Sequence, residues 1–374
     1  MTLRPLRTVA LAATATMVLA ACGGSPTATG GSDGGDTASD GPTEAEELYE
    51  EVMALSGSER RDRLVELATE EGQLNLYTSM TSDVAEAVSE AFSDTFDIDV
   101  NLYRANGETV AQRILQEQEA GYAGNDVVET DGIELAALEQ EEVMTPYEGE
   151  RRELVPEAGL FDSWTATRFN VFTPSWNTDA VSPEEAPSTW EDLADPRWDG
   201  QLSMELGDVD WYLTLKEYWL EQGKSEEEVT QLFQDMADGA KAVKGHTVQA
   251  ELMSAGEYHV TASNYSYIVE KAKQDGAPVE YLPYVEPAIA RPNGVGLMKT
   301  AANPAAALLF TDWLLEEGQQ VLTDEGLSAA IVQGDDPLAE VELIPVDIAG
   351  VIEQSEELTA EYEALLANAE QLEE

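Results

Sequence analysis

The sequence has few basic residues, two histidines and one cysteine. Among its 374 residues are 19 Lys and Arg against 75 Asp and Glu, which gives a formal net charge of −56 at pH 7. A surface this acidic repels phosphate backbones, so nucleic acid is excluded as an expected partner. A single cysteine excludes an internal disulfide and a cysteine-based zinc site. His246 and His259 are too far apart for a metal pair on one helix and are expected to be structural.

Long apolar runs are also missing after the first twenty residues. The composition is nevertheless 43% apolar and 25% charged, which is typical of a folded chain and not of a disordered one. The length is sufficient for two packed domains. The acidic excess leaves two interpretations open, a cationic ligand or a life in high salt that screens the repulsion between the acids.

The N-terminus resembles a bacterial lipoprotein signal peptide. A short basic start precedes an apolar run from Val9 to Ala20, which is too short to span a bilayer permanently, and Leu19-Ala20-Ala21-Cys22 closes it. The resemblance implies that residues 1–21 are removed and that lipid is attached to the sulfur of Cys22. We therefore expect a protein that lies outside the cytoplasm and is held to the membrane by its lipid anchor.

Two segments connect this anchor to the body of the protein. Residues 22–43 are rich in Gly, Ser, Thr and Asp, the composition of a flexible tether. Residues 44–72 are expected to form two N-terminal helices, the second beginning after a cap at Ser58 and ending at Gly72.

The body begins with strands that alternate with amphipathic helices. Apolar residues alternate over 73–77 and 98–102, a third short strand covers 126–128, and a helical pattern follows each strand. This order predicts an α/β fold with a parallel sheet, in which ligands gather at the carboxyl ends of the strands. Three loops would meet there, at 78–83, 104–108 and 129–132. The candidate ligand-binding residues on them are Thr78, Ser79, Thr81, Asn106, Gly107 and Asp131.

A second α/β unit follows, with a β-rich run over Arg168–Trp176 and further strands near 201–205 and 258–262. Residues 341–374 form a C-terminal segment, read over its long stretch 348–374 as acidic helix that braces one part of the body.

Several short motifs in a fixed order resemble a known family. They are Glu71–Ser79, Asn125–Val128, Trp190–Leu193 with Asp195–Gly200, Gly276–Glu280, and Pro304–Gln320. Over about Glu71 to Gly326 the sequence is similar to the extracytoplasmic solute-binding proteins of ABC importers, in the branch that contains the ferric-iron-binding proteins.

This resemblance implies a two-lobed, type II periplasmic-binding-protein fold in which each lobe is a sheet flanked by helices. Lobe 1 would comprise 73–172 and 288–340, and lobe 2 would comprise 173–287. Two crossing strands near Thr173–Asn177 and Pro283–Arg291 would act as the hinge. The expected protein is a monomer and not an enzyme. It would close over one small ligand and deliver it to an ABC permease in the membrane.

The resemblance also suggests metal ligands. Iron-binding members use an acid that corresponds here to Asp131 and a tyrosine pair that corresponds to Tyr265 and Tyr267, which serine separates in this chain. Thr81 takes the place of a further side-chain ligand and is a poor substitute for it. Phenolate and carboxylate oxygens suit hard Fe³⁺. We expect ferric iron or another metal as the transported ligand, with no other cofactor.

Three carboxylates near a helix start leave alternatives open. Glu205, Asp208 and Asp210 would repel an anion there. They either cap the helix on an acidic surface or bind a metal or an organic, polyamine-like cation, with Trp176 or Trp211 as an aromatic face. Ligand sensing shares the same fold. A surface hydrolase that uses Glu205 and Asp210 is the enzymatic alternative.

Overall fold

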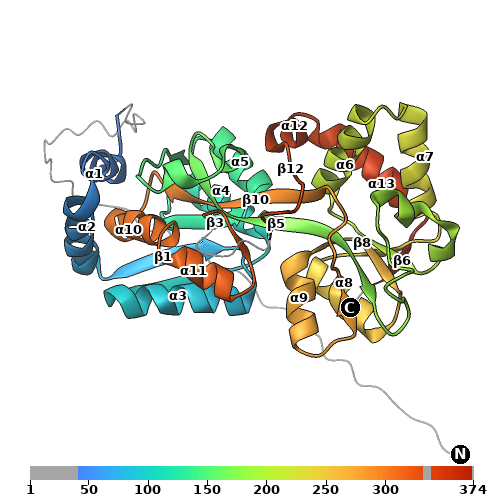
Figure 1. The fold of residues 1–374 in the computed structure, drawn as a ribbon. Coiled ribbons are helices and arrows are strands. Elements are labelled where there is room, and N and C mark those ends of the chain that lie inside the picture. The colour runs from blue at the N-terminus through green and yellow to red at the C-terminus, as the bar shows by residue number, and fades with distance from the viewer. Residues whose placement is uncertain (1–40, 332–337, 373–374) are drawn as a thin grey trace, which may run out of the picture. The chain divides into compact units, whose positions relative to one another are not determined.

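Parallel strands separated by helices build the first sheet region (Figure 1). In this computed structural model, which describes residues 41–331 and 338–372, the strands pair in the order β3-β1-β2. The strands are β1 (Gln73–Thr78), β2 (Asp99–Arg104) and β3 (Val127–Asp131), and the helices are α3 (Ser82–Phe96), α4 (Gly107–Glu119) and α5 (Gly132–Gln140). The predicted strand–helix alternation is confirmed. β2 lies at the edge of the sheet, which is why its residues are largely exposed.

Two helices precede the first strand, as expected. α1 (Glu44–Met53) begins with a capping box between Thr43 and Glu46. α2 (Gly57–Glu71) starts one residue before the predicted cap, since Ser56 and not Ser58 is its N-cap residue. Both helices contact α10 (Pro304–Leu314), and the shared core includes Tyr49, Leu64 and Phe310.

Two long antiparallel strands form the middle of the sheet. β5 (Trp164–Asn177) and β10 (Ala288–Met298) pair from Trp164 opposite Gly296 to Phe172 opposite Ile289. β10 also pairs with β3, and β5 pairs with β8, so these strands join the first sheet region to a second one. β5 contains the crossing predicted at 173–177. The second crossing was predicted too early, because β10 begins only at Ala288 and the preceding segment contains prolines, which lack an N–H donor.

The second sheet region repeats the parallel arrangement. Its strands follow the order β13-β7-β6-β8 and are β6 (Leu202–Glu205), β7 (Lys241–Val243), β8 (Val260–Tyr265) and β13 (Glu370–Leu372). The helices are α6 (Val209–Glu221), α7 (Glu226–Ala237), α8 (His246–Ala255) and α9 (Ser266–Gln274). Its core is rich in aromatic side chains, among them Trp190, Trp211, Trp219 and Phe233.

The C-terminal segment is more varied than the single acidic helix that was predicted. β12 (Leu343–Pro345) pairs with β10, and then come α12 (Ile348–Glu353), α13 (Ser355–Leu366) and β13. α12 contacts both α5 and α6, whereas α13 packs on α6 and α7, so the segment touches both sheet regions (Figure 1). The remaining short elements are β4 (Met144–Thr145), β9 (Val279–Glu280), β11 (Ser328–Ala329) and α11 (Gly318–Asp324).

By their backbone contacts, Pro42–Glu374 form one unit. The predicted signal peptide (1–21), Cys22 and nearly all of the tether lie outside the described residues. Across 41–331 and 338–372, every helix is too short or too polar to cross a membrane.

Candidate functional site

A cavity of about 980 Å³ is lined by residues of both sheet regions. The first region contributes the start of α3 and the end of β2, and the second contributes α8 and α9. Its lining includes Thr81, Ser82, Arg104, Ser254, Tyr267 and Lys271. Thr81 is the N-cap residue of α3 and makes no side-chain capping bond. Arg104 is held in place because its Nε donates to the carbonyl of Met80 at 2.8 Å.

The predicted loops of the first region do meet at one edge. Because β1 and β3 are parallel neighbours, the Thr130 hydroxyl lies 2.9 Å from that of Ser79. Gly107 lies directly beside Asp131, since a Cβ atom on Gly107 would be 2.5 Å from Asp131 Oδ2. A larger residue here would force the Asp131 side chain to shift, and the close approach brings the α4 and α5 starts together.

Two other predicted residues in these loops are engaged within the fold. Thr78 is fully buried and its hydroxyl donates to the Glu129 carboxylate at 2.9 Å. The Asn106 side chain caps α4 by accepting from the backbone N–H of Thr109 at 2.8 Å.

The central strands present a polar patch that the sequence analysis did not single out. Directly opposed residues of antiparallel strands share a face, and here Arg168 is opposite Asn293 and Asn170 is opposite Arg291. We call these four residues the floor patch. Arg168 pairs with Glu129 at 3.2 Å, and Arg291 approaches Asp210 at 3.4 Å. Alternating polar residues in the strand were visible in the sequence, but they resemble an ordinary solvent-facing side of a strand.

The carboxylates near the start of α6 all have internal partners. Glu205 accepts from the backbone N–H groups of Gly207 and Gly245, and Asp208 lies 3.1 Å from His246 Nε2 and accepts from Ser263. Asp210 is fully buried and faces Arg291. All three carboxylates thus make contacts within the fold, as the interpretation of these residues as local capping and internal pairing expects.

His246, which was expected to be structural, belongs to this polar cluster. Its ring stacks on that of Tyr265 with centroids 3.9 Å apart. Burial alone would lower the pKa of His246, but the charge and hydrogen bond of Asp208, followed by the charge of Glu205, raise it above the ordinary value. The imidazolium and the Asp208 carboxylate therefore stabilise each other.

The pKa values of Asp131 and Glu134, at the start of α5, are shifted in opposite directions. Burial opposes ionisation of Asp131, but a hydrogen bond with Glu134 and the charge of Arg291 lower its pKa. Burial and the neighbouring Asp131 raise the pKa of Glu134 well above its ordinary value. Of the pair, Asp131 therefore loses its proton more readily than Glu134.

Tyr265 and Tyr267 flank the polar cluster in different ways. Tyr265 is buried, with the Arg291 guanidinium 5.1 Å from its ring centroid. Tyr267 lines the cavity, and its ring lies parallel to that of Tyr265 at 6.0 Å. Burial raises the pKa of both phenols, while Arg168 and Arg291 oppose the rise at Tyr267. Within the described residues no group of three or more His, Cys, Asp or Glu is placed to hold a metal ion.

Two tryptophans predicted at the site lie elsewhere. Trp176 is 3% exposed and Trp211 is fully buried, both in the hydrophobic core of the second sheet region. The structure therefore places them in the core and not on an aromatic face for a ligand, because large rings gain more from burial than from facing solvent.

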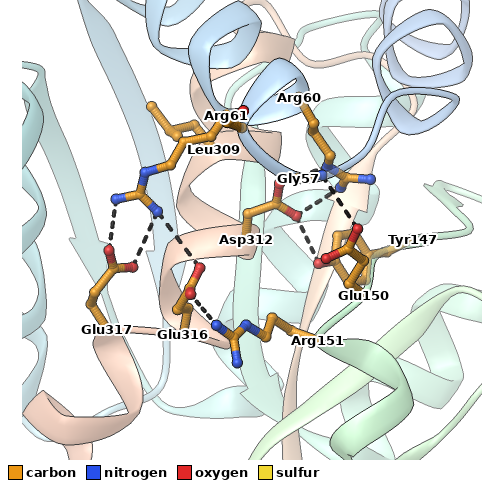
Figure 2. A pocket seen from close by; sticks show the side chains of 11 residues that line it. Gly57, Arg60, Arg61, Tyr147, Glu150, Arg151, Leu309, Asp312, Glu316 and Glu317 are labelled. Atoms are coloured by element: carbon orange, nitrogen blue, oxygen red, sulfur yellow. Dashed lines mark hydrogen bonds and ion pairs between the residues drawn. The ribbon is translucent and has the colours of Figure 1, made fainter.

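A second cavity, of about 420 Å³, lies where α2 meets α10 and has a different character (Figure 2). Figure 2 shows Arg60 beside Asp312, Arg61 beside Glu317 and Arg151 beside Glu316. Tyr147 also donates to Asp312 at 2.7 Å. Every arginine here faces a carboxylate. The ion pairs of Arg60 and Arg61 therefore hold α2 against the body of the protein.

Comparison with known proteins identifies the family. Residues 134–346, more than half of the chain, match the model of the bacterial extracellular solute-binding proteins. The chain belongs to this family. It is accordingly a solute-binding protein and not an enzyme, and it functions outside the cytoplasm, as the sequence predicted.

Individual relatives agree with this assignment. Iron uptake protein A1 of Synechocystis is 26% identical over 291 residues, which cover 72% of this solute-binding protein and 78% of the relative. Among solved structures, AfuA from Actinobacillus pleuropneumoniae with fructose-6-phosphate has a TM-score of 0.69 and 19% identity, over 80% of this chain and 100% of that one. Iron-bound HitA from Pseudomonas aeruginosa has a TM-score of 0.65 and 20% identity, over 78% and 99%. These neighbours confirm the type II periplasmic-binding-protein fold.

Proposed function

We propose that this protein captures one small ligand between its two sheet regions and delivers it to an ABC permease. The observation that carries the proposal is the cavity of about 980 Å³, which α3 and Arg104 line from the first region and α8 and α9 line from the second. A ligand held by both sides stabilises their closed arrangement over the open one, which is all that closure requires. In this proposal the lobes have the boundaries expected from the sequence, with β5 and β10 as the hinge.

Ferric iron is the ligand that we propose first. The relatives named above include an iron uptake protein and an iron-bound protein. Tyr267 lines the cavity, the ring of Tyr265 lies parallel to it at 6.0 Å, and Asp131 acts electrostatically on Tyr265. These residues offer phenolate and carboxylate oxygens, the donors that Fe³⁺ prefers. Because burial raises the pKa of both tyrosines, iron has to displace their protons, and its affinity should increase with pH.

Membrane attachment belongs to the same proposal. The match of residues 19–22 to a lipoprotein signal supports a lipid on Cys22, which keeps the protein near its permease. Substitution Cys22→Ala should move the protein from the membrane fraction to the soluble fraction. Retention of the variant in membranes would contradict the anchor without affecting the proposal on ligand capture.

Native mass spectrometry and calorimetry of the purified protein test the proposed ligand. We expect one ferric ion per chain, with an absorption band from iron–phenolate charge transfer that Tyr267→Phe weakens. Tyr122→Phe serves as a matched control, because Tyr122 is 61% exposed and lies outside the site. Iron that binds equally well to the Tyr267 variant, or a bound ligand that is chemically altered over time, would contradict the proposal.

A further inference from the structure

The C-terminal segment crosses from one sheet region to the other beside the hinge strands. β12 pairs with β10 from Ala288 to Ala290, and β3 pairs with the same strand from Asn293 onward. Because β5 occupies the opposite edge of β10 along this stretch, β3 and β12 lie end to end on one edge. The helices that follow these two strands, α5 and α12, therefore begin next to each other. We call β12 and α12 (residues 343–353) the strap.

The start of α12 is in direct contact with the start of α5. A Cβ atom on Gly132 would lie 2.9 Å from Cδ1 of Ile348, so a larger residue at this position would collide with the strap. Ile348 and Val351 are each 3% exposed and belong to the core of the second sheet region. Ile133 and Ala136 of α5 pack against that same core, although α5 follows a strand of the first region. The strap thus makes an apolar contact between the two regions.

The rest of the C-terminal segment fixes the strap to the second region. α12 also contacts α6, and α13 packs on α6 and α7. The Tyr362 hydroxyl donates to the backbone carbonyl of Glu205 at 2.7 Å, and Lys216 pairs with Glu361 at 2.8 Å. β13 adds a strand beside β7. The strap therefore moves with the second region, and its contact with α5 is the part that a hinge motion changes.

The strap and the cavity lie on opposite sides of the hinge strands. Figure 1 shows α12 on one side of the β5–β10 pair and, on the other, α3, α8 and α9, which line the cavity of about 980 Å³. A rotation about β5 and β10 that brings α3 toward α8 and α9 therefore moves α5 away from α12. Such a closure exposes apolar surface that the α5–α12 contact buries, which is unfavourable in water.

We infer that the strap opposes closure and thereby tunes the affinity for the ligand. Part of the binding free energy offsets the loss of the α5–α12 contact, and only the remainder appears as affinity. The same contact keeps the ligand-free protein open, so that a closed protein signals a bound ligand to the permease. The inference rests on the proposed capture between the two sheet regions and adds a regulatory element to it.

Distances between the regions in ligand-free protein test this inference. Spin labels at Asp94→Cys on α3 and Gln274→Cys on α9, both exposed positions, report the separation in a protein whose Cys22 is replaced by serine. Ile348→Ala shortens the side chain at the contact and should raise the closed, short-distance population by about three- to ten-fold. The apparent dissociation constant for Fe³⁺ supplied with citrate should fall by the same factor.

Two further variants complete the test. Leu366→Ala is the matched control, because Leu366 is also 3% exposed in the same core but lies on α13, which packs on α6 and α7. It removes as many atoms as Ile348→Ala and should lower stability without changing the distances or the affinity. Ile133→Ala alters the contact from the α5 side and should act in the same direction as Ile348→Ala, so the inference stays testable if Ile348→Ala does not fold.

The outcomes separate this inference from the proposed function. Unchanged distances and affinity in both Ile348→Ala and Ile133→Ala, with ligand-induced closure intact, would overturn the role of the strap and leave capture in place. A longer distance or weaker binding in these variants would also overturn it, because the strap would then favour closure. If ligand leaves the wild-type distances unaltered, capture between the regions is contradicted, whereas a shifted ligand-free population in Ile348→Ala would still support the strap.

Discussion

Two buried arginines, Arg60 at the α2–α10 junction and Arg291 at the centre of the sheet, have similar burial and different contacts. Arg60 is 9% exposed and Arg291 is 13% exposed, so solvent does not explain the difference. Arg60 makes two hydrogen bonds of 2.7 Å to Asp312 (Figure 2). It makes a third, also of 2.7 Å, to the carbonyl of Glu148. Arg291 makes one side-chain hydrogen bond, of 3.4 Å to Asp210, and its Nε has no hydrogen-bond partner. The hydrogen bonds of the first side chain are complete within the fold, and those of the second are not.

The largest effect should come from ionic strength, which acts on the exposed acids more than on either buried arginine. With a net charge of −56, repulsion between like charges opposes folding when it is not screened. Reducing KCl from about 1 M to about 10 mM lengthens the screening distance from about 3 to about 30 Å and should lower the melting temperature markedly. Thermal unfolding followed by circular dichroism measures the melting temperature at each KCl concentration. A melting temperature independent of salt would contradict an acidic surface adapted to high salt.

Breaking the Arg60 pair should cause the next largest change. Arg60→Met leaves Asp312 and its partner Tyr147 buried without the cation, which should lower the free energy of unfolding by about 3–5 kcal/mol. Arg61→Met is the control, because this more exposed pair with Glu317 contributes only about 0–1 kcal/mol. Urea unfolding gives both values. Ligand affinity should stay unchanged in the two variants, and a loss of affinity in Arg60→Met would break the distinction between the two arginines.

Removing the carboxylate that pairs with Arg291 should strengthen ligand binding. Asp210→Asn leaves the guanidinium without its competing internal anion, so its affinity for an anion such as citrate should rise. The free energy of unfolding should fall by about 1–3 kcal/mol, because the buried guanidinium loses a charged partner. Calorimetry with citrate measures the affinity. Weaker binding in Asp210→Asn would indicate that Asp210 itself contacts the ligand.

The smallest expected effect is a pH dependence of stability that comes from His246. Asp208 raises the pKa of His246, so the stabilisation is complete below the unfolded-state pKa of about 6.5 and is lost as pH rises through the higher folded-state pKa. Each unit of that shift corresponds to about 1.4 kcal/mol. His246→Gln should remove this slope from the unfolding free energy, whereas His259→Gln should preserve it. An unchanged slope in His246→Gln would show that another group titrates.

Much of the fold could be predicted because its signals are local. Alternation in β1 and the helical period of α3 lie within short windows, and parallel order brings Ser79 near Thr130 without further information. The C-terminal strand β13 could not be predicted, since three residues carry no pattern and pair with a strand far away in the sequence.

The candidate site was predicted less completely because its contacts are distant in sequence. Asp131 and Tyr267 were predicted as site residues from loop positions and a family resemblance. Arg291 and its partner Asp210 are 81 residues apart, and no spacing rule connects them. Trp211 was wrongly predicted to face the ligand, because a ring beside a helix start can face inward or outward. Here it is buried in the hydrophobic core.

The distance between the two sheet regions, with and without ligand, tests the central claim most directly. Spin labels at Asp94→Cys on α3 and Gln274→Cys on α9, both exposed positions, report it in a protein whose own Cys22 is replaced by serine. We predict that one equivalent of ferric citrate shifts the distance distribution to a single shorter population and that the ligand is recovered unchanged. A distribution that bound ligand leaves unaltered would contradict capture between the two regions.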